Sequence, residues 1–273
     1  MLNRKTIHIT GIRLSYFESN ESAQKTIFFF HGNGNSANLW KAQLNNVLLE
    51  DYKLIAFDLP SHGESGALKD GDCNLLFMGS LMARCVLELC GDMPYLLCGL
   101  SLGGNVIAEM LAHPVHPDAL VIIGSNFVGQ GIRPEDIISD RLLSKVLYSN
   151  EATALEVQTY LNRAILGKSR EHLQLLLSDY RKTDPGFRMA FSTSVAAGRY
   201  SDEIQLLQKY GRPILFCFGK EDIICSIDVI SKLIPYTWNN AIVQIPESGH
   251  LVTLDQAEVF NMTLRNFIEE IYT

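Results

Sequence analysis

The sequence has few charged residues, no block of basic residues and no long apolar run. Asp, Glu, Lys and Arg make up 19% of its 273 residues, and the formal net charge is −7. This negative balance argues against nucleic acid as the main partner. The apolar runs are too short to span a membrane, and residues 1–6 lack the apolar stretch of a signal peptide. We therefore expect a cytoplasmic chain with no membrane span.

The cysteines form no recognisable metal-binding pattern. There are six of them, no two are spaced as C-x-x-C, and none clusters with histidine at the spacing of a zinc site. We therefore expect no bound metal. Cys98 and Cys217 lie within apolar runs, where a thiol acts as a small core residue. Thiols used in this way fit a reducing compartment.

What the chain does have is enough apolar sequence for a large core, arranged as alternating strands and helices. Hydrophobic residues make up 47% of the chain, which is typical of a folded α/β domain. Apolar runs predict eight strands, at 6–9, 12–17, 26–30, 53–57, 94–98, 119–123, 213–218 and 241–245. Helical spacing predicts helices between them, at 36–49, 74–90, 105–113, 226–234 and 255–271. The first two strands read as a hairpin, and the βαβ alternation that follows requires a mostly parallel sheet with helices on both faces.

The alternation stops between residues 127 and 201. This stretch holds four helical patterns and no strand between them, near 134–148, 151–166, 169–182 and 186–197. We predict a helical cap (127–201) inserted after the sixth strand into a core domain formed by 1–126 and 202–273. Some apolar cap residues could line a pocket, although packing is the simpler role for most: Phe127, Tyr148, Leu155, Tyr160, Phe187 and Phe191. Three cap arginines could bind a carboxylate, although a solvated cap surface is the simpler expectation: Arg133, Arg188 and Arg199.

A serine between two glycines follows the strand at 94–98. In the sequence Gly99-Leu100-Ser101-Leu102-Gly103 the turn is so tight that side chains two positions before and after the serine would collide. With a strand entering and a helix leaving, such a turn raises the Ser101 hydroxyl above the sheet edge, close to the positive end of the helix dipole. The pattern predicts a nucleophile.

A serine hydroxyl needs a base, and a histidine suits that role at neutral pH. His250 follows the last strand, and Asp222 follows the strand before it. A carboxylate at the second ring nitrogen fixes the tautomer of the histidine, and the order Ser101, Asp222, His250 fits this architecture. Glu221 is a rival for the acid, and His250 could instead only cap the final helix. Loops that leave parallel strands meet at one edge of the sheet, so these residues are expected to converge.

An oxyanion that develops during reaction needs hydrogen-bond donors already in place. The backbone N–H of Leu102, at the start of the helix after Ser101, is one candidate. The second is the N–H of Asn33, in the loop after the strand at 26–30, with Gly34 as its competitor. We expect His31 to brace this loop.

Five motifs at strand ends resemble those of the α/β-hydrolase fold superfamily, in its small, lid-bearing, serine esterase-like branch. They are His31-Gly-Asn-Gly-Asn35, Asp58-Leu-Pro-Ser-His-Gly-Glu-Ser65, Gly99-Leu-Ser-Leu-Gly-Gly104, Gly219-Lys-Glu-Asp222 and Glu247-Ser-Gly-His250. The resemblance spans residues 6–272, with 127–201 as the variable cap. It implies Ser101 as nucleophile, Asp222 as acid, His250 as base, and Asn33 and Leu102 as oxyanion donors.

The second motif departs from the family pattern, because Ser61 stands where relatives of this type have glycine. The resemblance implies that Asp58 and His62 in the same motif hold their loop. Relatives that use aspartate at the elbow, such as dehalogenases and epoxide hydrolases, are disfavoured by Ser101.

The residues and the resemblance together predict hydrolysis of a small carboxylic ester through an acyl-enzyme on Ser101. No cofactor motif is present, and the glycines from Gly99 to Gly104 are not in the register of a dinucleotide-binding loop. Two alternatives remain open. The same triad could serve a C–C bond hydrolase, a thioesterase or an acyltransferase, or the scaffold could be a ligand-binding receptor without turnover.

Overall fold

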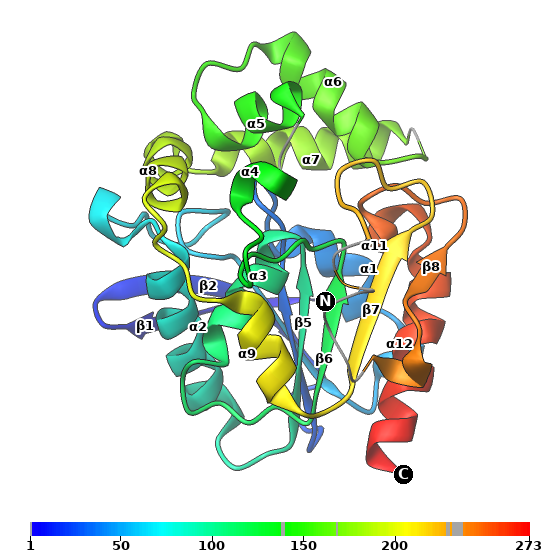
Figure 1. Ribbon diagram of the computed structural model, residues 1–273. Coiled ribbons are helices and arrows are strands. Elements are labelled where there is room, and N and C mark those ends of the chain that lie inside the picture. The colour runs from blue at the N-terminus through cyan, green and yellow to red at the C-terminus, as the bar shows by residue number, and fades with distance from the viewer. Residues whose placement is uncertain (1, 138–139, 168, 228–229, 231–236) are drawn as a thin grey trace.

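The computed structural model describes residues 2–137, 140–167, 169–227, 230 and 237–273 (Figure 1). Within them the chain forms one eight-stranded sheet in the order β1-β2-β4-β3-β5-β6-β7-β8. β1 pairs antiparallel with β2, β2 pairs antiparallel with β4, and the remaining neighbours are parallel. The strands are β1 (Asn3–Ile9), β2 (Ile12–Ser19), β3 (Thr26–Phe30), β4 (Lys53–Phe57), β5 (Tyr95–Leu100), β6 (Ala119–Ile123), β7 (Ile214–Gly219) and β8 (Val243–Ile245). The predicted mostly parallel α/β sheet is confirmed.

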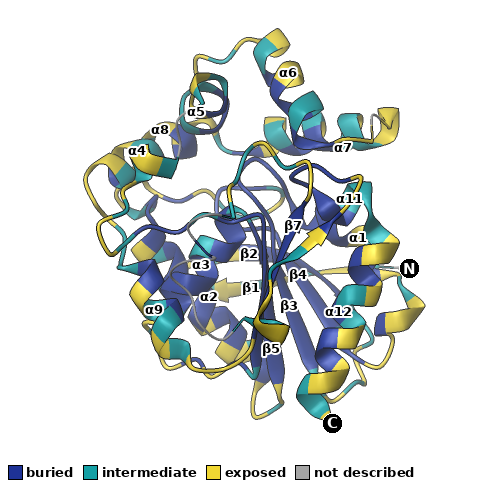
Figure 2. Cartoon of the chain, turned by 45° about the vertical axis from the view of Figure 1, so that its right-hand side comes forward, coloured by how far each residue is buried: buried dark blue, intermediate teal, exposed yellow. Residues whose placement is uncertain are grey.

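The central strands are buried on both faces, as their continuous apolar runs predict. In β3 all five residues are buried, with Phe28 and Phe30 in one core cluster and Ile27 and Phe29 in the other. Helices α2 (Leu75–Cys90), α3 (Leu102–Met110) and α9 (Glu203–Tyr210) supply the first cluster, and α1 (Lys41–Leu44) and α12 (Ala257–Tyr272) supply the second. Figure 2 shows these strands as a buried layer between the helices.

The predicted helix at 36–49 is wrong: three short helices replace it, η1 (Ala37–Trp40), α1 and η2 (Val47–Leu49). Side chains that bond to the local backbone separate α1 from η2. Asn45 Nδ2 donates to Lys41 O, and Asn46 Oδ1 accepts from Leu48 N–H at the start of η2.

Other helix predictions need smaller changes. The predicted final helix at 255–271 corresponds to α12. A short helix, α11 (Val252–Asp255), precedes it, and α9 was not anticipated. The predicted helix at 226–234 falls mostly outside the described residues. Two short 3-10 helices lie elsewhere in the chain: η3 (Asp70–Asp72) before α2 and η4 (Trp238–Asn240) before β8. No helix within the described residues has the length and apolar character needed to cross a lipid bilayer.

The stretch between β6 and α9 is helical, and its helices lie over the carboxyl ends of the strands (Figure 1). They are α4 (Pro134–Ile137), α5 (Arg141–Tyr148), α6 (Ala154–Ala164), α7 (Arg170–Lys182) and α8 (Pro185–Ala196). Hydrogen bonds tie them to the strand-end loops. Asn33 Nδ2 donates to Leu147 O, and Ser36 Oγ donates to Asp179 Oδ2. The division into a cap domain (127–201) and a core domain remains a prediction.

Candidate active site

Ser101 lies in a tight turn between β5 and α3. Its φ and ψ are 53° and −117°. This conformation is energetically costly for a non-glycine residue and persists only where the surrounding structure enforces it. The flanking glycines allow this turn, because a Cβ on Gly99 would lie 2.5 Å from Gly103 C and one on Gly103 would lie 2.1 Å from Phe30 O. Ser101 N–H donates to Ile123 O at 2.8 Å. The strand, the strained serine and the helix thus occur in the predicted order.

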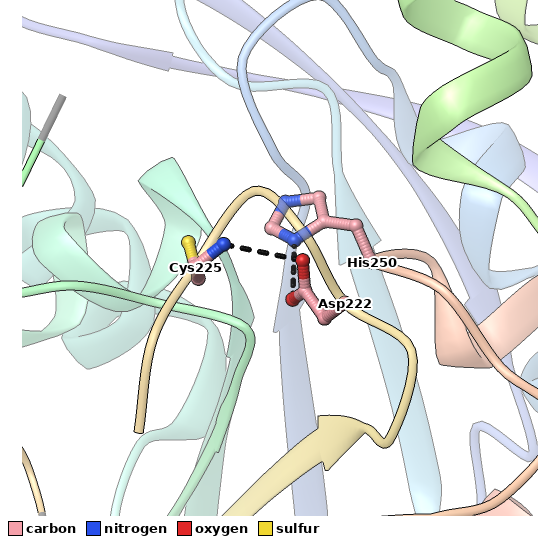
Figure 3. Close-up of side chains that lie close together, drawn as sticks. All are labelled: Asp222, Cys225 and His250. Carbon is pink, nitrogen blue, oxygen red and sulfur yellow. Dashed lines mark hydrogen bonds and ion pairs between the residues drawn. The ribbon is translucent and has the colours of Figure 1, made fainter. Parts of the chain in front are cut away.

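Asp222 and His250 form a buried pair. Asp222 follows β7, His250 follows β8, and their side chains are 2% and 3% exposed. His250 Nδ1 lies 2.9 Å from Asp222 Oδ2, while Asp222 Oδ1 accepts the N–H groups of Ile224 and Cys225 (Figure 3). The rival carboxylate, Glu221, instead accepts Ser248 N–H at 3.0 Å.

Neighbouring groups stabilise the negative charge of Asp222. Burial alone would raise the pKa of this carboxyl, but the facing His250 ring and the two backbone N–H donors lower it below the ordinary value. Asp222 is therefore ionised at neutral pH. An ionised carboxylate at Nδ1 directs the other ring nitrogen, Nε2, away from the pair, where it can accept a proton.

Ser101 and the His250 ring both approach the end of β6. The serine bonds to Ile123 O, and a Cβ on the next residue, Gly124, would lie 3.0 Å from His250 Nδ1. Within the described residues, no hydrogen bond joins the Ser101 hydroxyl to the His250 ring. The structure therefore brings Asp222 and His250 into contact and brings Ser101 to the same strand end without that third bond. Such bonds often tighten only when substrate binds.

The loop after β3 packs against Ser101. A Cβ on Gly32 would lie 3.3 Å from Ser101 Cβ. The side chain of Asn33 is held by Leu147 O, and its backbone N–H donates no hydrogen bond among the described residues. The Leu102 N–H is the first of α3 and has no acceptor one turn earlier in the helix. Both N–H groups are therefore available as donors.

Two buried histidines stand behind this loop. His31 Nε2 accepts Leu59 N–H at 2.9 Å and its Nδ1 donates to Gly32 O, so the ring links the loops after β3 and β4. Burial lowers the pKa of His31 to about 4. His62 Nδ1 lies 2.9 Å from Pro60 O, and burial lowers its pKa to about 3. Both rings are neutral braces at physiological pH.

The loop after β4 is fixed by its own polar residues. Asp58 accepts Ala37 N–H, Glu64 N–H and the Arg4 guanidinium. Ser61 has a φ of 64°, and its hydroxyl accepts Leu68 N–H. The left-handed conformation at Ser61 is one that glycine adopts without cost, whereas the serine gains a hydrogen bond there.

A small cavity opens beside Ser101, between the strand ends and the inserted helices. Its wall is mostly apolar and includes Tyr148 of α5 and Phe191 of α8. The remaining cap residues considered from the sequence do not line this cavity. Phe127, Phe187 and Tyr160 are buried in the core clusters, and Leu155 is 75% exposed. An apolar cavity with a few polar groups is typical of small-molecule sites.

One expectation about the cap arginines is wrong. Arg188 is buried at 6% exposure; its guanidinium stacks on the Tyr180 ring and donates to Tyr180 O. Arg133 and Arg199 are exposed, as expected. The buried arginine braces α8 against α7, a contact between side chains eight residues apart that helical spacing alone does not reveal.

Asp222, Cys225 and His250 also present ligand atoms within 4.8 Å of one another, the separation a metal site requires (Figure 3). Burial raises the pKa of the Cys225 thiol well above its ordinary value in the metal-free protein. Asp222 and Nδ1 of His250 are already engaged with each other. The cluster is better described as a hydrogen-bonded acid–histidine pair.

Sequence reasoning missed a polar group in the wall of the cavity. Asn105, four residues after Ser101 on α3, donates through Nδ2 to the carboxyl of Glu203. Residues four apart share one helix face, so the position of Asn105 could have been anticipated. Glu203 could not, because its partners Asn105 and Val128 are 98 and 75 residues away in the chain.

Comparisons with known proteins agree with the fold. A family model described as "alpha/beta hydrolase fold" matches residues 25–257. A bifunctional esterase/perhydrolase of Acinetobacter calcoaceticus is 24% identical over 274 residues, which cover 94% of this chain and 96% of that protein. A putative aryl esterase from Burkholderia cenocepacia superimposes with a TM-score of 0.83 at 22% identity, covering 99% of both chains. An N-acyl homoserine lactonase, complexed as a mutant with N-hexanoyl homoserine lactone, gives 0.85 at 20% identity and covers 98% of both. At these identities the structural matches show the fold alone.

Proposed function

Because this chain belongs to the α/β hydrolase fold family, we propose that it is a serine hydrolase that cleaves small carboxylic esters through an acyl-enzyme on Ser101. His250 is the base and Asp222 the acid of the triad. The Asn33 and Leu102 N–H groups are the oxyanion donors. Esterase names among the similar proteins support ester cleavage as the reaction.

The observation that carries this proposal is the buried Asp222–His250 pair at the strand end where Ser101 sits. A carboxylate with a lowered pKa stabilises the imidazolium that forms when Nε2 accepts the serine proton. A solvated surface pair would have no such effect, because water would screen it. The pair is therefore built to activate a neighbouring hydroxyl.

The reaction follows from these groups. Ser101 Oγ forms a bond to the ester carbonyl carbon while its proton passes to His250 Nε2, and the carbonyl oxygen becomes an oxyanion facing the two N–H donors. The C–O bond to the alcohol then breaks, and the alcohol leaves with the proton from His250. Water adds to the acyl-enzyme by the same steps, which releases the acid and restores Ser101. The sum is ester plus water giving acid plus alcohol.

In this proposal the helices of residues 127–201 form a cap over the active site. They supply apolar wall residues such as Leu147 and Phe191 to the cavity, which favours an apolar acyl or alcohol group. All six cysteines are free thiols, which supports the cytoplasm as the place of action.

A fluorophosphonate probe tests the nucleophile and its activation together. We expect one labelled peptide, the one that contains Ser101, and hydrolysis of short p-nitrophenyl esters. Ser101→Ala should lose labelling and reduce kcat by about 10³-fold or more, while Ser22→Ala, an exposed serine far from the site, should behave as wild type. Retention of more than about a tenth of the activity in Ser101→Ala would remove Ser101 from this role. Analysis of products from ester, thioester and β-diketone substrates distinguishes the bond that is cleaved.

A further inference from the structure

The loop after β6 contributes to the cavity a side chain with an unused hydrogen-bonding atom. Asn126 lines the same cavity as Ser101. Its side-chain Oδ1 is buried and has no hydrogen-bond partner among the described residues. Buried polar atoms in folded proteins are nearly always paired, and an exception needs an explanation. A bound ligand at this cavity would supply the missing donor.

The backbone around Asn126 is fixed by a separate set of bonds. Asn105 Nδ2 donates to Asn126 O at 2.8 Å and to the Glu203 carboxyl at 2.9 and 3.1 Å. Val128 N–H donates to the same carboxyl at 3.1 Å. These bonds join α3, the loop after β6 and α9. They hold Asn126 in place while leaving its side-chain oxygen free.

The charge in this part of the cavity limits the ligand. Glu203 is fully buried, and burial raises the pKa of its carboxyl group well above the ordinary value. None of the described residues that line the cavity is Lys or Arg. A carboxylate entering this wall would lose its hydration and find no cation to pair with.

We infer that Asn126 is a specificity-determining residue, and that the substrate is an ester whose chain carries a neutral hydrogen-bond donor, of the amide or hydroxyl type, for Asn126 Oδ1 to accept. This inference rests on the proposed esterase function. A plain alkyl chain offers Oδ1 no donor and leaves it unpaired, so the site favours a chain that carries one. A carboxylate-bearing chain is disfavoured further, because the described part of the wall carries the Glu203 carboxyl group and no Lys or Arg.

The test compares three p-nitrophenyl esters of equal chain length: a plain alkanoate, its analogue with a secondary amide in the chain, and the monoester of a dicarboxylic acid. Several lengths place the amide at successive distances from the ester. At the best length we expect kcat/KM of wild type for the amide ester to exceed that for the alkanoate by about tenfold or more, with the carboxylate ester slowest. Asn126→Leu, which keeps the size of the side chain, should abolish the amide advantage.

The amide-to-alkyl ratio is the readout, because it does not move when a variant merely loses folded enzyme. Asn45→Leu, an exposed asparagine far from the cavity, is the matched control and should keep the wild-type ratio. Equal ratios in wild type and Asn126→Leu at every length, with ester hydrolysis intact, would overturn the inference and leave the proposed function standing.

Loss of the proposed function has a different signature: no ester is cleaved and Ser101 is not labelled. In that case the inference is tested by measuring ligand affinity by calorimetry, which needs no turnover. Ser101→Ala should bind the amide ester more tightly than the alkanoate, by about tenfold in Kd, and the additional Asn126→Leu change should remove the difference. Equal affinities in Ser101→Ala would overturn the role of Asn126.

Discussion

At the scale of single residues, the two neighbouring carboxylates after β7 have separate tasks. Asp222 faces the His250 ring, whereas Glu221 holds the Ser248 backbone. The spacing after the strand, Gly-x-x-Asp, favoured Asp222 but left Glu221 open, because a turn can direct either side chain toward the histidine. The backbone N–H groups of Ile224 and Cys225 settle the direction of the Asp222 side chain by binding its second oxygen.

Asp222→Asn should separate charge from shape. The amide fills the same space, but it cannot stabilise an imidazolium and it permits the wrong tautomer of His250. We expect kcat for a short p-nitrophenyl ester to fall by about 10³- to 10⁴-fold, with KM little changed. Glu221→Gln keeps an oxygen for Ser248 N–H and should stay near wild type. A loss of less than about tenfold in Asp222→Asn would assign the histidine another partner.

At the scale of elements, apolar runs were enough to predict every strand of the described sheet to within a few residues. Short helices were harder. The segment 36–49 has helical spacing, yet Asn45 and Asn46 bond to the local backbone and divide it. In α9 the only fully buried apolar residues are Ile204 and Leu207, and the helix is too short for a clear helical pattern. Contacts such as Arg188 on Tyr180 or Glu203 on Asn105 depend on how helices pack, so no local pattern encodes them.

The junction of β5 and α3 gives a sharp prediction at this scale. A Cβ on Gly103 would meet Phe30 O and Phe30 C, which belong to the backbone of β3 and cannot rotate away. We expect Gly103→Ala to lower the free energy of unfolding by about 3 kcal/mol, measured by urea unfolding, and to reduce kcat because the turn that carries Ser101 must shift.

Gly71→Ala is the matched control for that change. Nothing lies within 4 Å of a Cβ at Gly71, and its φ is not in the left-handed region. The control should therefore keep both stability and activity. Wild-type stability in Gly103→Ala would mean that α3 can move away from β3, contrary to the close approach of the two backbones.

At the scale of the whole molecule, buried neutral histidines make the fold sensitive to acid. His31 and His62 are both fully buried and lie in edge contact at a ring separation of 5.2 Å. Their pKa values, about 4 and about 3, lie below the 6.5 of an exposed histidine. Between these limits the unfolded chain binds protons that the folded chain does not. Stability is therefore lost as pH falls from 6.5 toward 4.

Other buried groups make the folded state more stable as pH falls. The effect of the histidines on stability is therefore measured as the difference between wild type and a histidine variant. Burial raises the pKa of Glu203, Glu109 and Asp179, and these carboxyls favour the folded state as they gain protons. Their contribution is shared by wild type and a histidine variant. It therefore cancels when the two free energies of unfolding are subtracted at each pH.

His31→Gln is the variant to compare with wild type at each pH. The glutamine weakens the loop brace at every pH, so the variant starts less stable than wild type. The variant has no neutral imidazole at this position in the core, so its stability should fall less steeply below pH 6.5. The difference between its free energy of unfolding and that of wild type should narrow by about 3 kcal/mol between pH 7 and pH 4. His8→Gln, on an exposed position of β1, should run parallel to wild type. A constant difference for His31→Gln over this range would mean that His31 gains its proton equally readily in the folded and unfolded chains. The ring would then not be held neutral in the folded protein as the brace behind Ser101.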